Sequence, residues 1–152
     1  MMKSFRFKMS TGSNDFAPPE RVRLATNQGL IGYKITKLQL IPKDPTDASH
    51  EAVVQVFATR PGGNNPGDTD EIDFGNPSLL ACAHYSNHSS GTIYSEDSTI
   101  IFDSTQVNQD MWVTCKTDSV GKHINLYLEL EQTTLSTHEA AVATLKDMRG
   151  RE

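Results

Sequence analysis

The stretch that decides the fold is His123-Ile124-Asn125-Leu126-Tyr127-Leu128-Glu129-Leu130-Glu131. Its aliphatic residues occupy every second position, and polar residues or tyrosine stand between them. Strict alternation of this kind fits an extended chain with one dry face and one wet face. A parallel strand covered by helices on both faces is a continuous apolar run instead, so this stretch predicts a strand of an antiparallel sheet.

The size and composition of the chain favour one loop-rich β domain. A chain of 152 residues can bury a core without metal or disulfide bonds, and its 36% hydrophobic and 7% aromatic content is low. We expect a β-sandwich over residues 1–135 and a C-terminal helix and tail of the same domain over 136–152. Cys82 and Cys115 are too few for a disulfide framework, so they predict buried, reduced thiols.

Short alternating or β-branched segments recur along the chain, separated by clusters of Gly, Pro, Asn and Asp. The predicted strands are residues 3–9, 21–25, 30–41, 51–60, 72–74, 78–85, 99–102, 111–116 and 123–131, with an exposed turn at 86–91. With no helical pattern between them, these strands predict an all-β fold, namely an antiparallel β-sandwich that is jelly-roll-like or another Greek-key arrangement.

Two details of strand arrangement follow from the pattern. The apolar parity in residues 30–41 changes between Ile35 and Leu38, which predicts a β-bulge between them. A short connection containing Gly121 joins residues 111–116 to 123–131, and its hairpin length predicts that these two strands are antiparallel neighbours.

The end of the chain carries the pattern of a short C-terminal α-helix. Ser136-Thr137-His138-Glu139 has the spacing of a capping box, and Gly150 can close the end, so we predict a helix from about Thr137 to Arg149. A helix of this length is marginal alone and must dock on the sandwich or on an adjoining subunit. Its predicted docking stripe is Ala141, Val142, Leu145 and Met148.

The net charge of −5 is distributed unevenly along the chain. Residues 1–43 hold eight bases and two acids, a net of +6, whereas residues 44–115 hold eleven acids and one base, a net of −10. Opposite charges of this kind can pair strands within a sheet, or set which edge meets which neighbour in an assembly. The acidity disfavours nucleic-acid binding. The absence of a long apolar run and of a signal peptide predicts no membrane association and synthesis in the cytoplasm.

Candidate chemical sites are weak. Cys82, His84 and His88 could bind zinc, but the sequence shows no evident fourth ligand. A cluster of acids could bind calcium, but it lacks the residue spacing of an EF-hand and predicts a solvated loop instead. No nucleophile elbow appears. We therefore expect no catalytic residue, metal or cofactor. The acidic cluster comprises Asp68, Asp70, Glu71 and Asp73.

Four rings could stack on a sugar if they were exposed on one face, and these are Tyr33, Tyr85, Tyr94 and Trp112. Trp112 stands between Met111 and Val113 in a predicted strand next to the deciding one, which favours a place in the core.

The closing segment is similar to that of a known class of proteins. The strand 124–131 is followed by Leu135-Ser136, Glu139-Ala140-Ala141 and Ala143-Thr144-Leu145-Lys146-Asp147-Met148-Arg149. This ending resembles that of small virion structural proteins of tailed bacteriophages. The shared order is a strand with Glu on its wet face, then a capped short helix, then a basic tail. The resemblance covers about the last thirty residues well. It implies a capsid decoration or cement protein, commonly a homotrimer at three-fold positions, and it brings no catalytic residue.

From this resemblance we expect a non-enzymatic phage virion structural protein, made in the host cytoplasm and placed on the capsid surface, with the major capsid protein as partner. Such a protein binds a lattice through many weak contacts and needs no deep pocket. The predicted interface residues are Phe5, Arg6, Phe7, Lys8, Val142, Leu145 and Met148.

Two alternatives belong to other functional classes. One is a carbohydrate-binding module or the receptor-binding tip of a virion fibre, with Tyr85, Tyr94 or Trp112 as the stacking platform. The other is an enzyme that holds a metal with Cys82, His84 and His88.

Overall fold

The computed structural model describes residues 1–10, 19–26, 29–44, 50–61, 72–88, 94–102, 106–117 and 122–150. Within these ranges the chain forms eight strands and one helix, in two antiparallel sheets, which confirms the predicted all-β sandwich with a short C-terminal helix. The elements are β1 (Met2–Met9), β2 (Glu20–Val22), β3 (Ile31–Pro42), β4 (His50–Phe57), β5 (Leu79–His88), β6 (Tyr94–Ile101), β7 (Met111–Thr117), β8 (Ile124–Thr134) and α1 (Thr137–Gly150).

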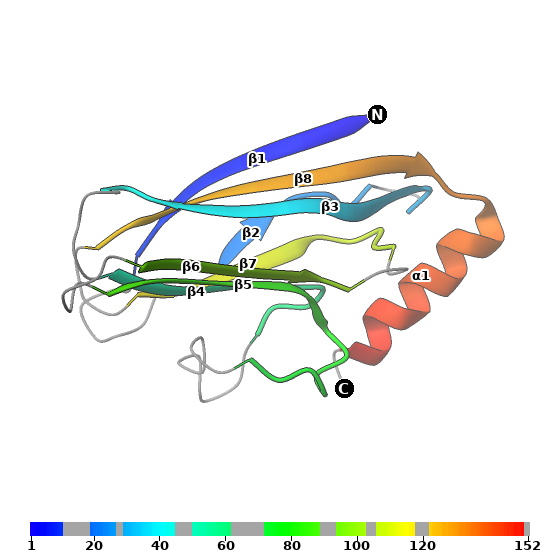
Figure 1. Ribbon diagram of the computed structural model, residues 1–152. Coiled ribbons are helices and arrows are strands. Elements are labelled where there is room, and N and C mark those ends of the chain that lie inside the picture. The colour runs from blue at the N-terminus through cyan, green and yellow to red at the C-terminus, as the bar shows by residue number, and fades with distance from the viewer. Residues whose placement is uncertain are drawn as a thin grey trace.

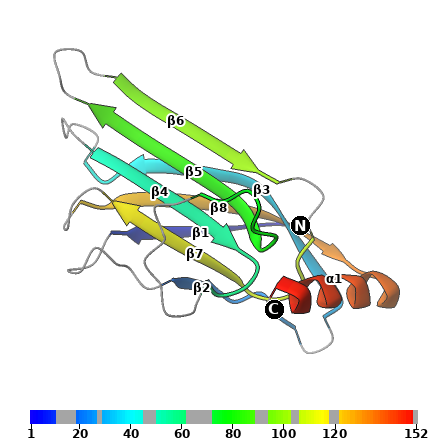
Figure 2. The ribbon, with the colours of Figure 1, turned by 90° about the horizontal axis from the view of Figure 1, so that it is seen from below.

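The strand order is that of a jelly roll with one departure. Sheet A has the order β1-β8-β3, and sheet B has the order β2-β7-β4-β5-β6. The two sheets lie one above the other (Figure 1), and Figure 2 shows the strands of sheet B side by side. Pairing of the first strand with the last, the second with the seventh and the fourth with the fifth follows the jelly-roll path. The departure is β6, which pairs with β5 and lies near β3 without joining sheet A.

The deciding stretch forms most of β8, the central strand of sheet A. Its four aliphatic side chains are at most 2% exposed, whereas Asn125 and Glu131 on the opposite face are exposed, so the predicted alternation is confirmed. The inner face of sheet B completes the core. Its buried residues include Val54, Val56, Ala81, Ala83, Met111, Val113 and Cys115.

The predicted bulge in β3 is also confirmed. The register between β3 and β8 shifts between Ile35 and Lys37, where the hydroxyl of Thr36 donates a hydrogen bond to the carbonyl of Glu129 at 3.1 Å. The extra residue keeps the apolar side chains on both sides of the shift on the inner face, because it reverses the parity of the strand. Ile35 and Leu38 are both buried as a result.

Some predicted strands and pairings are wrong. β7 and β8 are not hairpin neighbours, because β7 lies in sheet B and β8 in sheet A. A connection of this length can either turn within a sheet or cross the roughly 10 Å between two packed sheets, and the sequence does not distinguish the two. Residues 72–74 form no strand, and residues 86–88 continue β5 instead of turning, since they pair with residues 94–96 of β6.

The helix α1 has the predicted bounds to within one residue and lies at one end of the sandwich (Figure 1). The hydroxyl oxygen of Ser136 accepts a hydrogen bond from the Glu139 N–H at 3.2 Å, as the capping pattern predicts. The predicted docking stripe is wrong, however. Ala140 and Ala143 are the buried residues, and they pack with Leu30 and Leu135 in a small separate cluster.

Small side chains bring the helix close enough to the sandwich for polar contacts with Asn108, which is fully buried. The Asn108 side-chain amide nitrogen lies 3.0 and 3.3 Å from the carbonyl oxygens of Gly29 and Ala140 and 2.9 Å from the Thr144 hydroxyl, so these three acceptors share its two N–H groups. Gly29 has a φ of 64°, a conformation that favours glycine. Asn108 therefore joins the turn before β3, the segment before β7 and the helix.

Candidate interaction surface

The predicted interface residues lie in two separate places. Phe5 and Phe7 are half-buried against the core, and Arg6 and Lys8 are exposed on the other face of β1. Residues 5–8 pair with residues 125–128 in the first half of β8, whereas α1 follows the opposite end of that strand. The structure therefore does not join the two halves of the predicted interface into one patch.

The helix exposes two large apolar side chains among those that the structure describes. Val142 is 41% exposed and Leu145 is 54% exposed, because the helix docks through its alanines instead. The side chain of Met148, the third predicted helix residue, lies outside the described residues. Val142 and Leu145 are thus available at the surface, but they do not dock the helix on the sandwich as the sequence predicted.

The outer face of sheet A is an open, charged surface. The central strand β8 contributes acids, and the flanking strands β1 and β3 contribute bases. In the strand register, Glu129 stands between Ser4 and Lys37, and Glu131 stands between Met2 and Lys34. The charged residues of this face are Arg6, Lys8, Lys34, Lys37, Glu129 and Glu131.

The charge of this face opposes that of the whole chain. Four bases minus two acids give the face a net charge of +2, against −5 for the chain. Within the described ranges, none of the four bases lies within ion-pair distance of a carboxylate. Their charges are therefore available to a partner, and screening by salt would weaken such contacts.

Tyr127 lies at the centre of this face. Its hydroxyl donates a hydrogen bond to the Glu129 carboxylate at 2.8 Å, and the Lys37 ammonium lies 5.8 Å from the centre of its ring. The hydrogen bond to Glu129 raises the pKa of Tyr127, partial burial and the charge of Glu129 act in the same direction, and a hydrogen bond with Ser4 opposes them. Tyrosine and arginine are common anchors of protein interfaces, so Tyr127 and Arg6, which are opposite in register, are candidate anchors.

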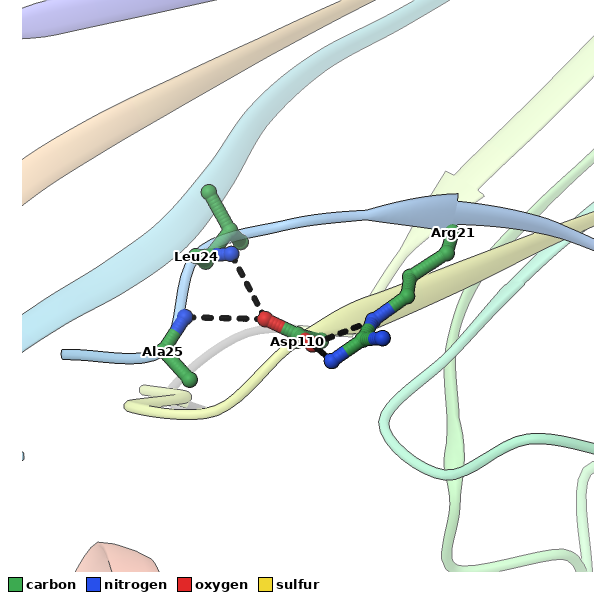
Figure 3. A network of polar contacts seen from close by, with 4 residues as sticks. All are labelled: Arg21, Leu24, Ala25 and Asp110. Atoms are coloured by element: carbon green, nitrogen blue, oxygen red, sulfur yellow. Dashed lines mark hydrogen bonds and ion pairs between the residues drawn. The ribbon is translucent and has the colours of Figure 1, made fainter.

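A second polar network fixes the short strand β2 against β7 (Figure 3). One carboxylate oxygen of Asp110 accepts hydrogen bonds from the N–H groups of Leu24 and Ala25 at 2.7 and 2.9 Å. The other accepts the Arg21 Nε–H at 2.6 Å and is also bound by a second guanidinium nitrogen. Burial alone would raise the pKa of Asp110, but the two backbone N–H groups and Arg21 outweigh it and lower the pKa. Sequence reasoning missed this network, because its partners are distant along the chain.

Trp112 is not a core residue, contrary to the prediction. It has the opposite parity to the core residues Met111 and Val113 and is half-buried on the outer face of sheet B. The guanidinium groups of Arg21 and Arg60 each lie 5.7 Å from the centre of its ring, at cation–π distance. Its ring is therefore covered on the surface by two cations.

The other rings proposed as a stacking platform are not exposed together. Tyr33 and Tyr85 are both buried in the core, so neither can stack on a sugar. The side chain of Tyr94 lies outside the described residues. The carbohydrate-binding alternative therefore retains only Trp112 among the rings that the structure describes.

Cys82 and His84, two of the three candidate zinc ligands, have other surroundings in the structure. Cys82 and Cys115 are buried free thiols, and burial raises the pKa of both, that of Cys115 to about 12. A nitrogen of His84 lies 3.0 Å from the Glu51 carboxylate. The described part of the chain holds no group of three or more residues able to bind a metal ion. The His88 side chain and the acidic residues 68–71 lie outside the described residues, and Asp73 is exposed.

Comparison with protein-family models, with characterised proteins and with solved structures gave no match to this chain. No helix in the described residues has the length and apolar character needed to cross a membrane.

Proposed function

We propose that the chain is a non-enzymatic structural protein of a tailed-phage virion, which decorates or cements the outside of the capsid as a trimer bound to the major capsid protein. The observation that carries the proposal is the outer face of sheet A. This face is open, and its four bases have no carboxylate partner within the described residues. A surface of this kind supports docking by many modest contacts, which repetition over a lattice multiplies.

The resemblance of the closing segment supports the same proposal, because it implies a β-sandwich with a capped terminal helix. The chain has both: two packed sheets, of which β8 is the closing strand, and the capped helix α1 directly after it. The positive outer face would bind the shell by approaching an acidic region of the capsid surface, and the contacts would be weakened by salt.

The test is co-sedimentation of the purified protein with purified phage shells that lack it. We expect binding at low salt, and a loss of at least tenfold in affinity for the variant Lys34→Glu/Lys37→Glu, which reverses two charges on the outer face of sheet A. The matched control is Arg23→Glu/Arg60→Glu, which makes the same change in charge at exposed positions beside sheet B. Wild-type protein that does not sediment with shells, or equal losses in both variants, would contradict the proposal.

A further inference from the structure

The two sheets leave four edge strands, and only two of these are long and regular. β2 has three residues, and β3 is interrupted by its bulge and by a bridge between Tyr33 and Val107. β1 and β6 each have eight residues and pair with one neighbour in unbroken register. Within the described ranges, no strand pairs with the other side of either one. Their backbone groups on that side are available to another chain.

The two long edges carry opposite charge. β1 contains Lys3, Arg6 and Lys8 and no acid, whereas β6 contains Glu96 and Asp97 and no base. Two copies that met through the same edge would place like charges together, which is unfavourable. A contact between β1 of one copy and β6 of another would place opposite charges together.

The two edges also lie on different sides of the sandwich. In sheet A, β3 lies near β5 and β6, and β1 is the strand farthest from it in that sheet. β6 is at the margin of sheet B in Figure 2, and β1 is the outermost strand of sheet A in Figure 1. One copy can therefore use β1 with one neighbour and β6 with another at the same time.

We propose that β1 of one copy adds to the β6 edge of a second copy of this chain, so that the copies associate head to tail. A head-to-tail contact forms a ring when the rotation between copies closes. The inference deepens the proposed function, since it names the contact that would build the proposed trimer and rests on that oligomer. Binding of an extended edge to another edge uses main-chain hydrogen bonds for affinity, and here charge selects the partner edge.

The first measurement is the mass of the purified full chain by size-exclusion chromatography with light scattering, without shells. We expect about 50 kDa for three copies of 16.8 kDa at low salt, and a shift toward 16.8 kDa as salt is raised. A wild-type chain that stays at 16.8 kDa at all concentrations would overturn the proposal.

Charge reversal then identifies the edges. Arg6→Glu/Lys8→Glu and Glu96→Lys/Asp97→Lys should each give monomers, and the chain that carries all four changes should regain the oligomer, because its edges are complementary again. Lys34→Glu/Lys37→Glu, on the other edge strand of sheet A, is the matched control and should keep the oligomer.

The proposal would be overturned if Glu96→Lys/Asp97→Lys kept the oligomer. It would also be overturned if the chain with all four substitutions stayed monomeric while circular dichroism showed it folded. Failure of a variant to fold leaves the salt dependence of the wild-type mass as the test. The outcome is separate from that of shell binding, since a chain can form this oligomer and not bind shells, or bind them as a monomer.

Discussion

Removal of the Asp110 carboxylate should destabilise the fold through the lost backbone contacts more than through the lost ion pair. Leu24 is buried, so its N–H would have no acceptor in the Asp110→Ala variant, whereas the Arg21 side chain is 49% exposed. An exposed ion pair is worth about 1 kcal/mol or less, and an unsatisfied buried donor costs about 1–3 kcal/mol. We expect Asp110→Ala to lower the free energy of unfolding by about 3 kcal/mol, with both effects combined.

The variant Asp110→Asn separates the two effects. Its amide oxygen can still accept hydrogen bonds from the N–H groups of Leu24 and Ala25, but its NH₂ group cannot pair with Arg21. The expected loss is about 1 kcal/mol. The measurement is urea unfolding followed by circular dichroism and by the fluorescence of Trp112, the single tryptophan. Equal losses for the two variants, or a loss below about 0.5 kcal/mol for Asp110→Ala, would refute the reasoning.

The same contacts make this stabilisation depend on pH. The pKa of Asp110 is lowered in the folded protein, so folding favours the ionised form. The stabilisation is fully present above the unfolded value of about 3.9 and is lost as the pH falls through the folded pKa. The difference in stability between the wild type and Asp110→Asn should therefore be constant near neutral pH and shrink in acid. A difference that grew in acid would show that folding raises the pKa of Asp110 instead of lowering it.

Three further outcomes are expected from other buried positions. Asn108→Ala should cost about 1–3 kcal/mol in urea unfolding, because it removes the amide that joins the helix to the sandwich. Gly32→Ala should cost about 1–3 kcal/mol, since a Cβ there would lie 2.8 Å from the buried side chain of Leu135, and an unchanged midpoint would show that Leu135 moves freely. Cys82 and Cys115 should react with a thiol reagent near neutral pH only after denaturation, because burial keeps both protonated, and rapid labelling of the native protein would disprove this.

Local patterning was enough to predict most of the strands, and the faces of β3 and β8. The alternation in β8 and the parity change in β3 reflect the fixed two-residue period of a strand, so a dry face and a bulge can be read directly from neighbouring residues. The helix was predictable for a similar reason, since its capping residues lie within one turn of each other.

Contacts between distant residues could only be seen in the tertiary structure. The connection between β7 and β8 has the length of a hairpin but crosses between sheets, and only the packing of both sheets decides between these paths. Helix periodicity suggested the larger side chains Val142 and Leu145 for docking, yet the residues that pack with Leu30 and Leu135 are Ala140 and Ala143. The Asp110 network joins residues more than 80 positions apart.

The sequence by itself determined the class of the fold, the central strand, the helix and the division of charge, because each depends on the identity or spacing of near neighbours along the chain. The tertiary structure decided which strands are edges, how basic strands flank an acidic one on the outer face of sheet A, and which helix side chains remain exposed. The first two features arise from strand order and the third from the docking of the helix, and both are set by long-range packing that no local pattern encodes.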